Sequence, residues 1–332
     1  MKGILNLRGK MGSGFRELGL LLFLVILIVI FTLLNDRFIS MDNILSLLRN
    51  TSILGILAIG MMVVIVSGCI DLSVGSVLAL TGMLSALTVQ YYPQTPAFVA
   101  ILIGMAAGLL CGLINGLLVA KGKIIPIIAT LGTMNIFRGL TFTVAGNSWV
   151  SAHQMNDGFK AIAVGNVGPI NNLIVIFVAT LIIAYYFMSY SRTGRYIYAV
   201  GSNPDSAEIT GIRKDRMIIL SYVILGLLAG LGGVLWASRF ASAQGDTAMG
   251  YELNVIAACV LGGVSVTGGV GKISGLILGV LILGVIENAL PLAGVSPFWQ
   301  VFIRGVIILS AIMMNIYVKR RSDSRVLKMR EL

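Results

Sequence analysis

Long runs of apolar residues, separated by short polar or glycine-rich segments, dominate the chain. Ten of these runs approach or exceed the length of about 20 residues that a bilayer-spanning helix needs. They lie at about 18–34, 44–67, 72–90, 97–120, 124–145, 170–189, 217–237, 252–267, 273–290 and 298–317. The run at 252–267 is short and rich in glycine at its end, so we expect an irregular or broken segment there. The pattern predicts an all-α integral membrane protein, with about ten transmembrane helices in one domain that covers residues 1–332.

The composition excludes several classes of soluble protein. Hydrophobic residues make up 57% of the 332 residues and charged residues only 11%, whereas a soluble domain has about 25% charged residues. A cytosolic enzyme, a disordered chain and a secreted disulfide scaffold are therefore excluded. The three cysteines lie in apolar surroundings without a CxxC spacing, so we expect neither a disulfide nor a metal site.

The charge pattern predicts the orientation in the membrane. The chain carries 24 Lys and Arg against 13 Asp and Glu, a net charge of +11. Most of the basic residues fall in the N-terminal tail, 121–123, 190–216, Lys272 and the C-terminal tail. Because basic residues concentrate in cytoplasmic connections, these segments and both termini are predicted to be cytoplasmic. The excess charge is thereby explained by topology, and we expect no nucleic-acid partner.

The sequence contains no arrangement typical of an enzyme. Its single histidine, His153, lies in a polar outer loop, so no Ser/His/Asp set is expected. The glycine-rich segment 268–274 resembles a phosphate-binding loop but fails its pattern, because Val266 stands where the first glycine is required and Ile273 where Ser or Thr must follow Lys272. We expect no catalytic residue, metal or cofactor in this chain. Any uphill transport would then be driven by a partner or by an ion gradient.

Polar residues at membrane depth are candidates for a substrate pathway, because lipid makes them costly unless they are paired or face a cavity. Asp71 and Ser73 interrupt a long apolar stretch at 67–76. This segment is consistent with a plain inner turn and equally with a discontinuous helix that lines a path. Both alternatives stay open at this point.

A second set of candidates lies in the run at 124–145. Thr130 and Arg138 fall near one helical face, and Asn135 and Arg138 are three residues apart. Such donors and acceptors would suit a neutral polyol, whereas the alternative is hydrogen bonding between helices and snorkelling. Glu252, near the outer end of a later run, completes the predicted pathway set.

The predicted inner loop at 190–216 contains the signals of a short, self-capped helix at 204–210. Asn203 is a good N-cap residue, Pro204 suits the first helical position, and Gly211 is placed as a stop. Glu208 complements the helix N-terminus, and the small side chain of Ala207 would allow close approach to a partner. A helix this short is unstable alone, so we interpret it as a docking element.

Five motifs, in order along almost the whole chain, resemble those of the transmembrane permeases of bacterial ABC importers for monosaccharides of the ribose and galactoside type. They are G-x-I-D-L-S-V-G-S at 68–76, I-N-G-L-L-V at 114–119, A-T-L-G-T at 129–133 with R-G at 138–139, A-V-G-x-N-P-x-x-A at 199–207, and E-L-x-x-I-A-A-x-V-L-G-G at 252–263 with G-G-x-G at 268–271. Cys69 stands where this family usually has a glycine.

The resemblance implies a subunit of the bacterial inner membrane that forms a homodimer or heterodimer of permeases. It also implies a cytoplasmic ATPase subunit that binds ATP and Mg, an extracytoplasmic sugar-binding protein, and a coupling role for the segment 203–212, within the loop 190–216. The residues of that segment carried over as ATPase-coupling residues are Asn203, Pro204, Ala207, Glu208 and Gly211. An ion-coupled secondary transporter, with Asp71 as the candidate relay, and a channel are the alternatives.

Overall fold

The computed structural model describes residues 2–146, 148–303, 305–307, 309–310 and 313. Its helices are α1 (Lys2–Leu34), α2 (Met41–Val66), α3 (Val74–Tyr91), α4 (Ala97–Ala120), α5 (Pro126–Ala145), α6 (Asp157–Val164), α7 (Asn172–Tyr190), α8 (Arg192–Ser202), α9 (Pro204–Ile209), α10 (Lys214–Phe240), α11 (Tyr251–Leu261) and α12 (Ile273–Leu292). Two 3-10 turns, η1 (Asp36–Ile39) and η2 (Ala152–Gln154), and a hairpin of β1 (Asn166–Val167) with β2 (Ile170–Asn171) connect them.

The prediction of an all-α integral membrane protein is confirmed. Eight of the described helices are long and apolar enough to cross a membrane: α1, α2, α3, α4, α5, α7, α10 and α12. The predicted break at 252–267 is also found, because α11 has only 11 residues and an irregular segment, 262–272, follows it. The predicted span at 298–317 and the basic C-terminal tail lie partly or wholly outside the described residues, although 297–303 is helical.

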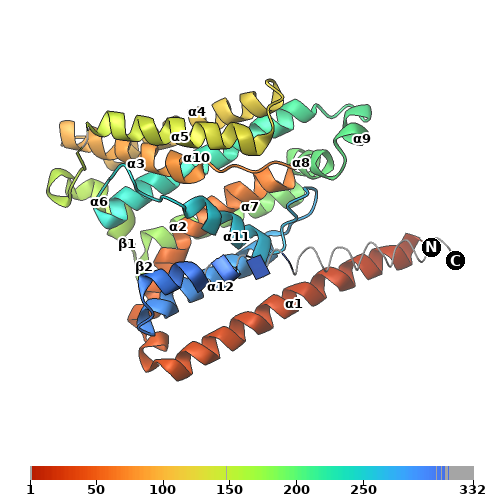
Figure 1. The fold of residues 1–332 in the computed structure, drawn as a ribbon, viewed down its shortest axis with the longest axis horizontal. Coiled ribbons are helices and arrows are strands. Elements are labelled where there is room, and N and C mark those ends of the chain that lie inside the picture. The colour runs from red at the N-terminus through yellow and green to blue at the C-terminus, as the bar shows by residue number, and fades with distance from the viewer. Residues whose placement is uncertain (1, 147, 304, 308, 311–312, 314–332) are drawn as a thin grey trace.

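The bundle is layered around α2 (Figure 1). Helices α4 and α5 lie on one side with α3 and α10 beneath them, and α12 and α1 lie on the opposite side of α2. In the most apolar stretch of α2, 89% of the residues are buried, whereas in that of α7 only 11% are. A helix that is hydrophobic all round belongs in such an interior, and α2 therefore forms the centre of the core.

Helices α4 and α10 pack closely through glycines spaced four residues apart on one face of α4. These glycines are Gly104, Gly108, Gly112 and Gly116. A Cβ atom on Gly108 would overlap the carbonyl oxygen of Gly226, and one on Gly116 would lie 2.9 Å from the Cα of Ile219. Small residues let backbones in a membrane approach in this way and replace hydrophobic burial by close van der Waals packing. The glycine-rich face thus fixes the position of α10 against α4.

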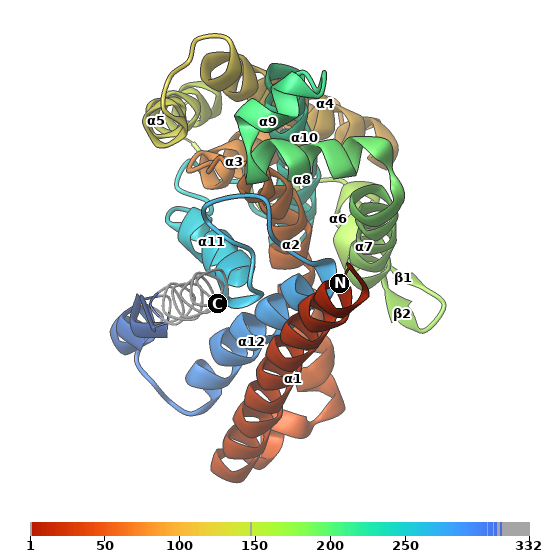
Figure 2. The same ribbon diagram turned by 90° about the vertical axis from the view of Figure 1, so that its right-hand side faces the viewer.

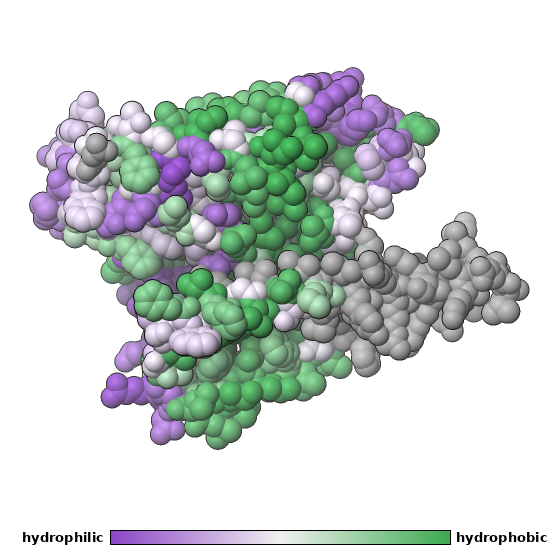
Figure 3. Space-filling view, in the orientation of Figure 1, coloured by the Kyte–Doolittle hydropathy of each residue, from purple (hydrophilic) through white to green (hydrophobic). Residues whose placement is uncertain are grey.

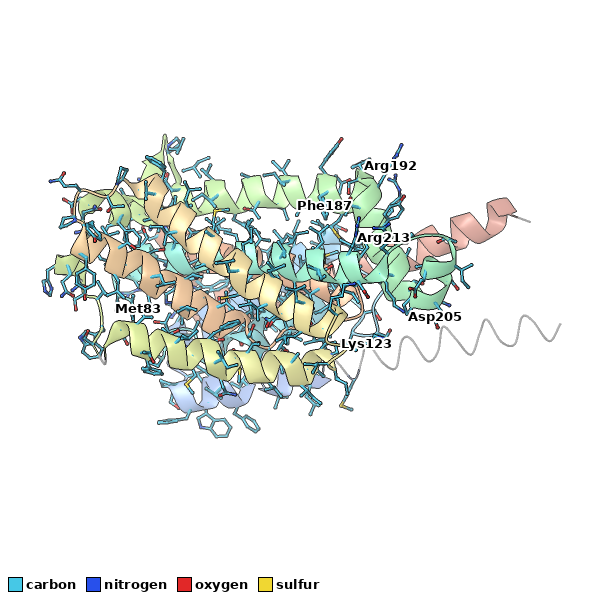
Figure 4. The ribbon with its side chains drawn as sticks, turned by 90° about the horizontal axis from the view of Figure 1, so that it is seen from above. Met83, Lys123, Phe187, Arg192, Asp205 and Arg213 are labelled. Carbon is cyan, nitrogen blue, oxygen red and sulfur yellow. The ribbon has the colours of Figure 1, made fainter. Side chains whose placement is uncertain are left out.

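The two ends of the bundle differ in charge and in structure. Lys123, Arg192 and Arg213 lie together at one end, which we call the basic end (Figure 4). Helices α8 and α9 lie at this end, whereas α6 and the β-hairpin lie at the opposite end (Figure 1). Hydrophilic surface gathers at both ends and a hydrophobic band runs between them (Figure 3). By the positive-inside rule, the basic end is the one expected to face the cytoplasm.

Candidate translocation and docking sites

The turn between α2 and α3 is buried, and its polar side chains are hydrogen-bonded to one another. Asp71 is 3% exposed and Ser73 is fully buried. Asp71 Oδ1 accepts from the backbone N and the Oγ of Ser73, each at 2.7 Å, and Asp71 Oδ2 accepts from Asn115 Nδ2 at 3.0 Å. Tyr222 of α10 donates to the carbonyl of Ile70 at 3.0 Å. These hydrogen bonds hold the turn in place in this conformation, and the pathway role of Asp71 and Ser73 stays a prediction.

Asn115 is the residue of this cluster that was not chosen as a site residue from the sequence. Its amide donates to Ser73 Oγ at 2.8 Å as well as to Asp71, so it ties α4 to the turn. The available signal was its place in the motif at 114–119, within a run that is otherwise apolar. The hydrogen bond of Thr130 is local by contrast, since this buried residue donates its hydroxyl to the carbonyl of Pro126, one turn earlier, at 2.8 Å.

The segment 241–250 between α10 and α11 is irregular, and Arg138 of α5 holds it. The guanidinium Nη1 donates to the carbonyls of Gly245 at 2.8 Å and Thr247 at 2.7 Å. Earlier in the same segment, Ala243 pairs with Val150 through two backbone hydrogen bonds of 3.0 Å. Non-helical backbone at membrane depth must have its polar groups satisfied inside the protein. Arg138 supplies part of that requirement, so its described contacts are structural.

The N-termini of α3 and α11 meet inside the bundle. A Cβ atom on Gly75 would lie 2.6 Å from the carbonyl oxygen of Ala248 and 2.7 Å from Glu252 Oε2. Glu252 is half-buried and lies within electrostatic range of Arg138. The structure therefore brings together two predicted pathway residues that are far apart in the sequence. Both Arg138 and Glu252 lie next to the non-helical backbone that precedes α11. Such interrupted helices are found at the substrate sites of membrane transporters.

Asn135 lies apart from this junction, on the exposed side of α5. Its amide donates to the carbonyl of Leu131, one turn earlier, at 2.9 Å. Exposed residues of 249–253, including Met249 and Leu253, occur near the start of α11. Seen from the basic end, α5 and α11 occupy the same side of the bundle (Figure 2). The prediction that Asn135 faces a pathway stays a prediction, which its exposure at membrane depth favours.

The predicted docking helix is present as α9, with both expected caps. Asn203 Oδ1 accepts from the backbone N of Ser206 at 2.9 Å, and Pro204 occupies the first turn. Gly211 has φ of +85°, and its N–H donates to the carbonyl of Glu208 at 2.9 Å. The N–H of Ile212 donates to the carbonyl of Ala207 at 3.0 Å. These two bonds form a Schellman motif, which explains why a glycine ends the helix.

The side chains of α9 divide into an inner and an outer set. Ala207 is 4% exposed and packs within this chain, and its role in ATPase coupling stays a prediction. Ile209 is 88% exposed, an unusual place for a large apolar side chain at the polar end of a membrane protein. Glu208 forms an ion pair of 2.7 Å with Lys214, which fastens α9 to the start of α10. Asp205 lies at the basic end of the bundle, beyond Arg213 (Figure 4).

The described residues hold no group of three or more His, Cys, Asp or Glu side chains that could bind a metal ion. What the described residues present is a helical membrane bundle with interrupted helices inside it and a small capped helix at its basic end. These features define a multi-pass membrane protein built for transport.

Comparison with known proteins identifies the family. Residues 43–312 match the family described as the permease component of a branched-chain amino acid transport system, and the chain belongs to this family. The chain is 41% identical over 300 residues to the ribose import permease protein RbsC of Bacillus subtilis, covering 90% of this chain and 92% of the relative. It is 40% identical over 297 residues to the RbsC protein of Haemophilus influenzae, covering 89% and 91%. It is 36% identical over 308 residues to the L-arabinose transport system permease protein AraH of Escherichia coli, covering 92% of each chain. No solved structure matches.

Proposed function

We propose that this chain is the membrane-spanning permease of an ATP-driven importer for a monosaccharide of the ribose, arabinose and galactose class. The observation that carries the proposal is the similarity along nearly the whole chain to permeases named for ribose and L-arabinose. A galactose/methyl galactoside import permease of Escherichia coli, 34% identical over 317 residues, extends the same substrate class. The protein lies in the bacterial inner membrane, with the basic end in the cytoplasm.

The proposed pathway runs along the exposed side of α5 and the start of α11, and a second permease copy completes it. Asn135 is exposed there, and Arg138 and Glu252 lie within electrostatic range of each other. Amide, guanidinium and carboxylate groups are suited to hydrogen-bond the hydroxyls of a neutral sugar. Because a polar residue at membrane depth is costly without a partner, the exposure of Asn135 supports a water-filled or protein-covered surface on this side.

The proposed ATPase contact is α9. Its caps fix its shape, and the buried Ala207 and the Glu208–Lys214 ion pair fix its position. The exposed Ile209 then provides an apolar anchor for a groove on a cytoplasmic subunit. ATP and Mg would bind on that subunit. A sugar-binding protein would deliver the substrate at the opposite end, where α6 and the β-hairpin lie.

Reconstitution tests the proposal. The chain is placed in proteoliposomes with its ATPase and binding protein, and uptake of radiolabelled ribose, arabinose, galactose and leucine is compared. We expect ATP-dependent uptake of one of the sugars, none of leucine, and no ATP hydrolysis by the chain alone. Leucine uptake would favour the amino-acid substrate in the family's description. Uptake driven by a proton or sodium gradient without ATP would refute the proposal.

A further inference from the structure

A half-open cavity of mixed polar and apolar lining lies at the basic end, between the end of α7, helix α8 and the start of α12. Its volume is about 540 Å³, within the range of about 300–1,000 Å³ typical of small-molecule sites. Its polar lining comprises Tyr185, Ser189, Arg195, Tyr198, Lys272 and Ser274. The proposed sugar pathway on the side of α5 and α11 does not use any of these residues.

The charges that line this cavity favour an anion. Arg195 and Lys272 contribute two positive charges from different elements. Arg195 uses Nη1 to donate to the carbonyl of Tyr190 at 2.9 Å, and a guanidinium has five N–H donors to share. Lys272 pairs with Glu17 of α1 across 3.2 Å, so one carboxylate offsets part of the charge. Two cations against one acid leave the cavity with a net positive charge.

The hydrogen-bonding groups of the cavity favour a phosphate in particular. Ser189 and Ser274 present hydroxyls, and Ser274 lies in the first turn of α12, where backbone N–H groups have no partner within the helix. The hydroxyl of Tyr198 donates to the carbonyl of Gly271 at 2.8 Å and so fixes the loop that carries Lys272. Guanidinium, ammonium and hydroxyl donors around one space form a set that matches phosphate oxygens.

The surroundings of the cavity favour a lipid as the source of that phosphate. Helix α7 packs on the core with one face and has exposed apolar residues on the other. The exposed side chains of Val178, Ile182 and Tyr185 follow one another at spacings of four and three residues. Such a stripe lies on one face of a helix and leads to the cavity. An acyl chain on this stripe would place its headgroup at Arg195 and Lys272.

We propose that this cavity binds the phosphate of an anionic phospholipid of the cytoplasmic leaflet. Basic pockets between transmembrane helices on the cytoplasmic side are a known way to hold anionic headgroups. The assignment of the leaflet depends on the orientation of the basic end, and it does not depend on which solute the permease carries.

Short-chain lipids that dissolve in detergent test the proposal on the purified full-length chain. Dihexanoyl-phosphatidylglycerol is titrated against dihexanoyl-phosphatidylcholine and inorganic phosphate, and binding is followed by native mass spectrometry and by the thermal unfolding midpoint. We expect saturable binding of phosphatidylglycerol and none of phosphatidylcholine. Binding of inorganic phosphate with equal affinity would replace the lipid by a free anion and overturn the lipid assignment.

Variants locate the site. Arg195→Gln and Lys272→Gln should each weaken phosphatidylglycerol binding about fivefold, the loss expected for one basic residue near a headgroup. Arg192→Gln removes an exposed charge from the same end, outside the cavity, and should leave the affinity unchanged. Glu17→Gln removes the competing carboxylate and should tighten binding, a change that misfolding cannot produce. Equal affinities for wild type, Arg195→Gln, Lys272→Gln and Glu17→Gln would overturn the proposal.

Discussion

Substitution of Gly108 by alanine tests whether the backbone contact between α4 and α10 stabilises the bundle. The added Cβ would overlap the carbonyl oxygen of Gly226 and lie 2.8 Å from both Cα and N of Gly230. All three atoms belong to the backbone, so no side-chain rotation can relieve the overlap. Overpacking costs about 1–3 kcal/mol, and backbone partners place this site at the upper end of that range.

An opposing effect has to be subtracted from that cost. Alanine is favoured over glycine inside a helix by about 1 kcal/mol. The net expectation for Gly108→Ala is therefore a loss of about 1–2 kcal/mol in the free energy of unfolding. Gly132→Ala provides the matched control, because a Cβ on Gly132 of α5 meets no atom within 4 Å. That variant should keep the propensity gain of up to about 1 kcal/mol and become more stable.

The free energy of unfolding of each variant can be measured by titrating the full-length chain in mixed micelles with a denaturing detergent. The two variants carry the same chemical change in two transmembrane helices, so any general effect of alanine cancels between them. A Gly108→Ala protein at least as stable as wild type would refute the reasoning. Equal destabilisation by both substitutions would refute it as well, since contact with a neighbouring helix would then not be the cause.

Three further substitutions test other parts of the structure. Arg138→Gln removes the charged donor to the carbonyls of Gly245 and Thr247, and should lower the free energy of unfolding by about 2 kcal/mol and speed hydrogen exchange in 241–250. Ile209→Asp changes an exposed side chain, so stability should stay within about 0.5 kcal/mol while uptake and ATPase stimulation fall; unchanged uptake would contradict the docking role of α9. Gly201→Ala places a Cβ against the carbonyl oxygen of Val66 and should cost about 1–3 kcal/mol in the same micelle titration, whereas wild-type stability would show that α8 can move away freely.

The transmembrane helices were largely predictable because their signal is local. The predicted runs at 97–120 and 273–290 coincide with α4 and α12 to within two residues. The predicted ends of the helices differ from those in the structure where polar residues extend a helix beyond its apolar run. Helix α10 begins at Lys214 rather than at 217, since Lys214 and Asp215 are helical yet do not raise the hydrophobicity of a run. Helix α3 begins at Val74 because Asp71 and Ser73 belong to the preceding turn.

Helix α9 shows which features local sequence signals can predict and which they cannot. Asn203, Pro204 and Gly211 act on their nearest neighbours in the sequence, so both ends of α9 were predicted to within one residue. The side of α9 that faces the protein depends on how α8 and α10 are placed, and no spacing in the sequence encodes that placement. The burial of Ala207 and the exposure of Ile209 were consequently not predictable from the sequence.

The candidate site was less predictable than the fold, because its contacts join distant segments. The carbonyls that Arg138 binds lie 107 and 109 residues away along the chain, and the Asp71–Asn115 bond spans 44 residues. Residue type correctly marked Arg138 and Asp71 as costly in lipid. It could not show that Arg138 donates to the carbonyls of Gly245 and Thr247 or that Asp71 accepts from Asn115.

The irregular segments contact the end of α8, the helix that precedes α9, through backbone atoms. Helix α8 leads directly into α9, and a Cβ on Gly201 near its end would overlap the carbonyl oxygen of Val66. The same carbonyl accepts the N–H of Gly269 at 2.9 Å, and Gly268 lies against Gly68. No side chain lies between these backbone segments, so a change of side-chain rotamer cannot accommodate a displacement of α8. A displacement of the end of α8 towards Val66 would therefore have to move the turn at 67–73 and the segment 262–272 with it, or break the hydrogen bond between Gly269 and Val66.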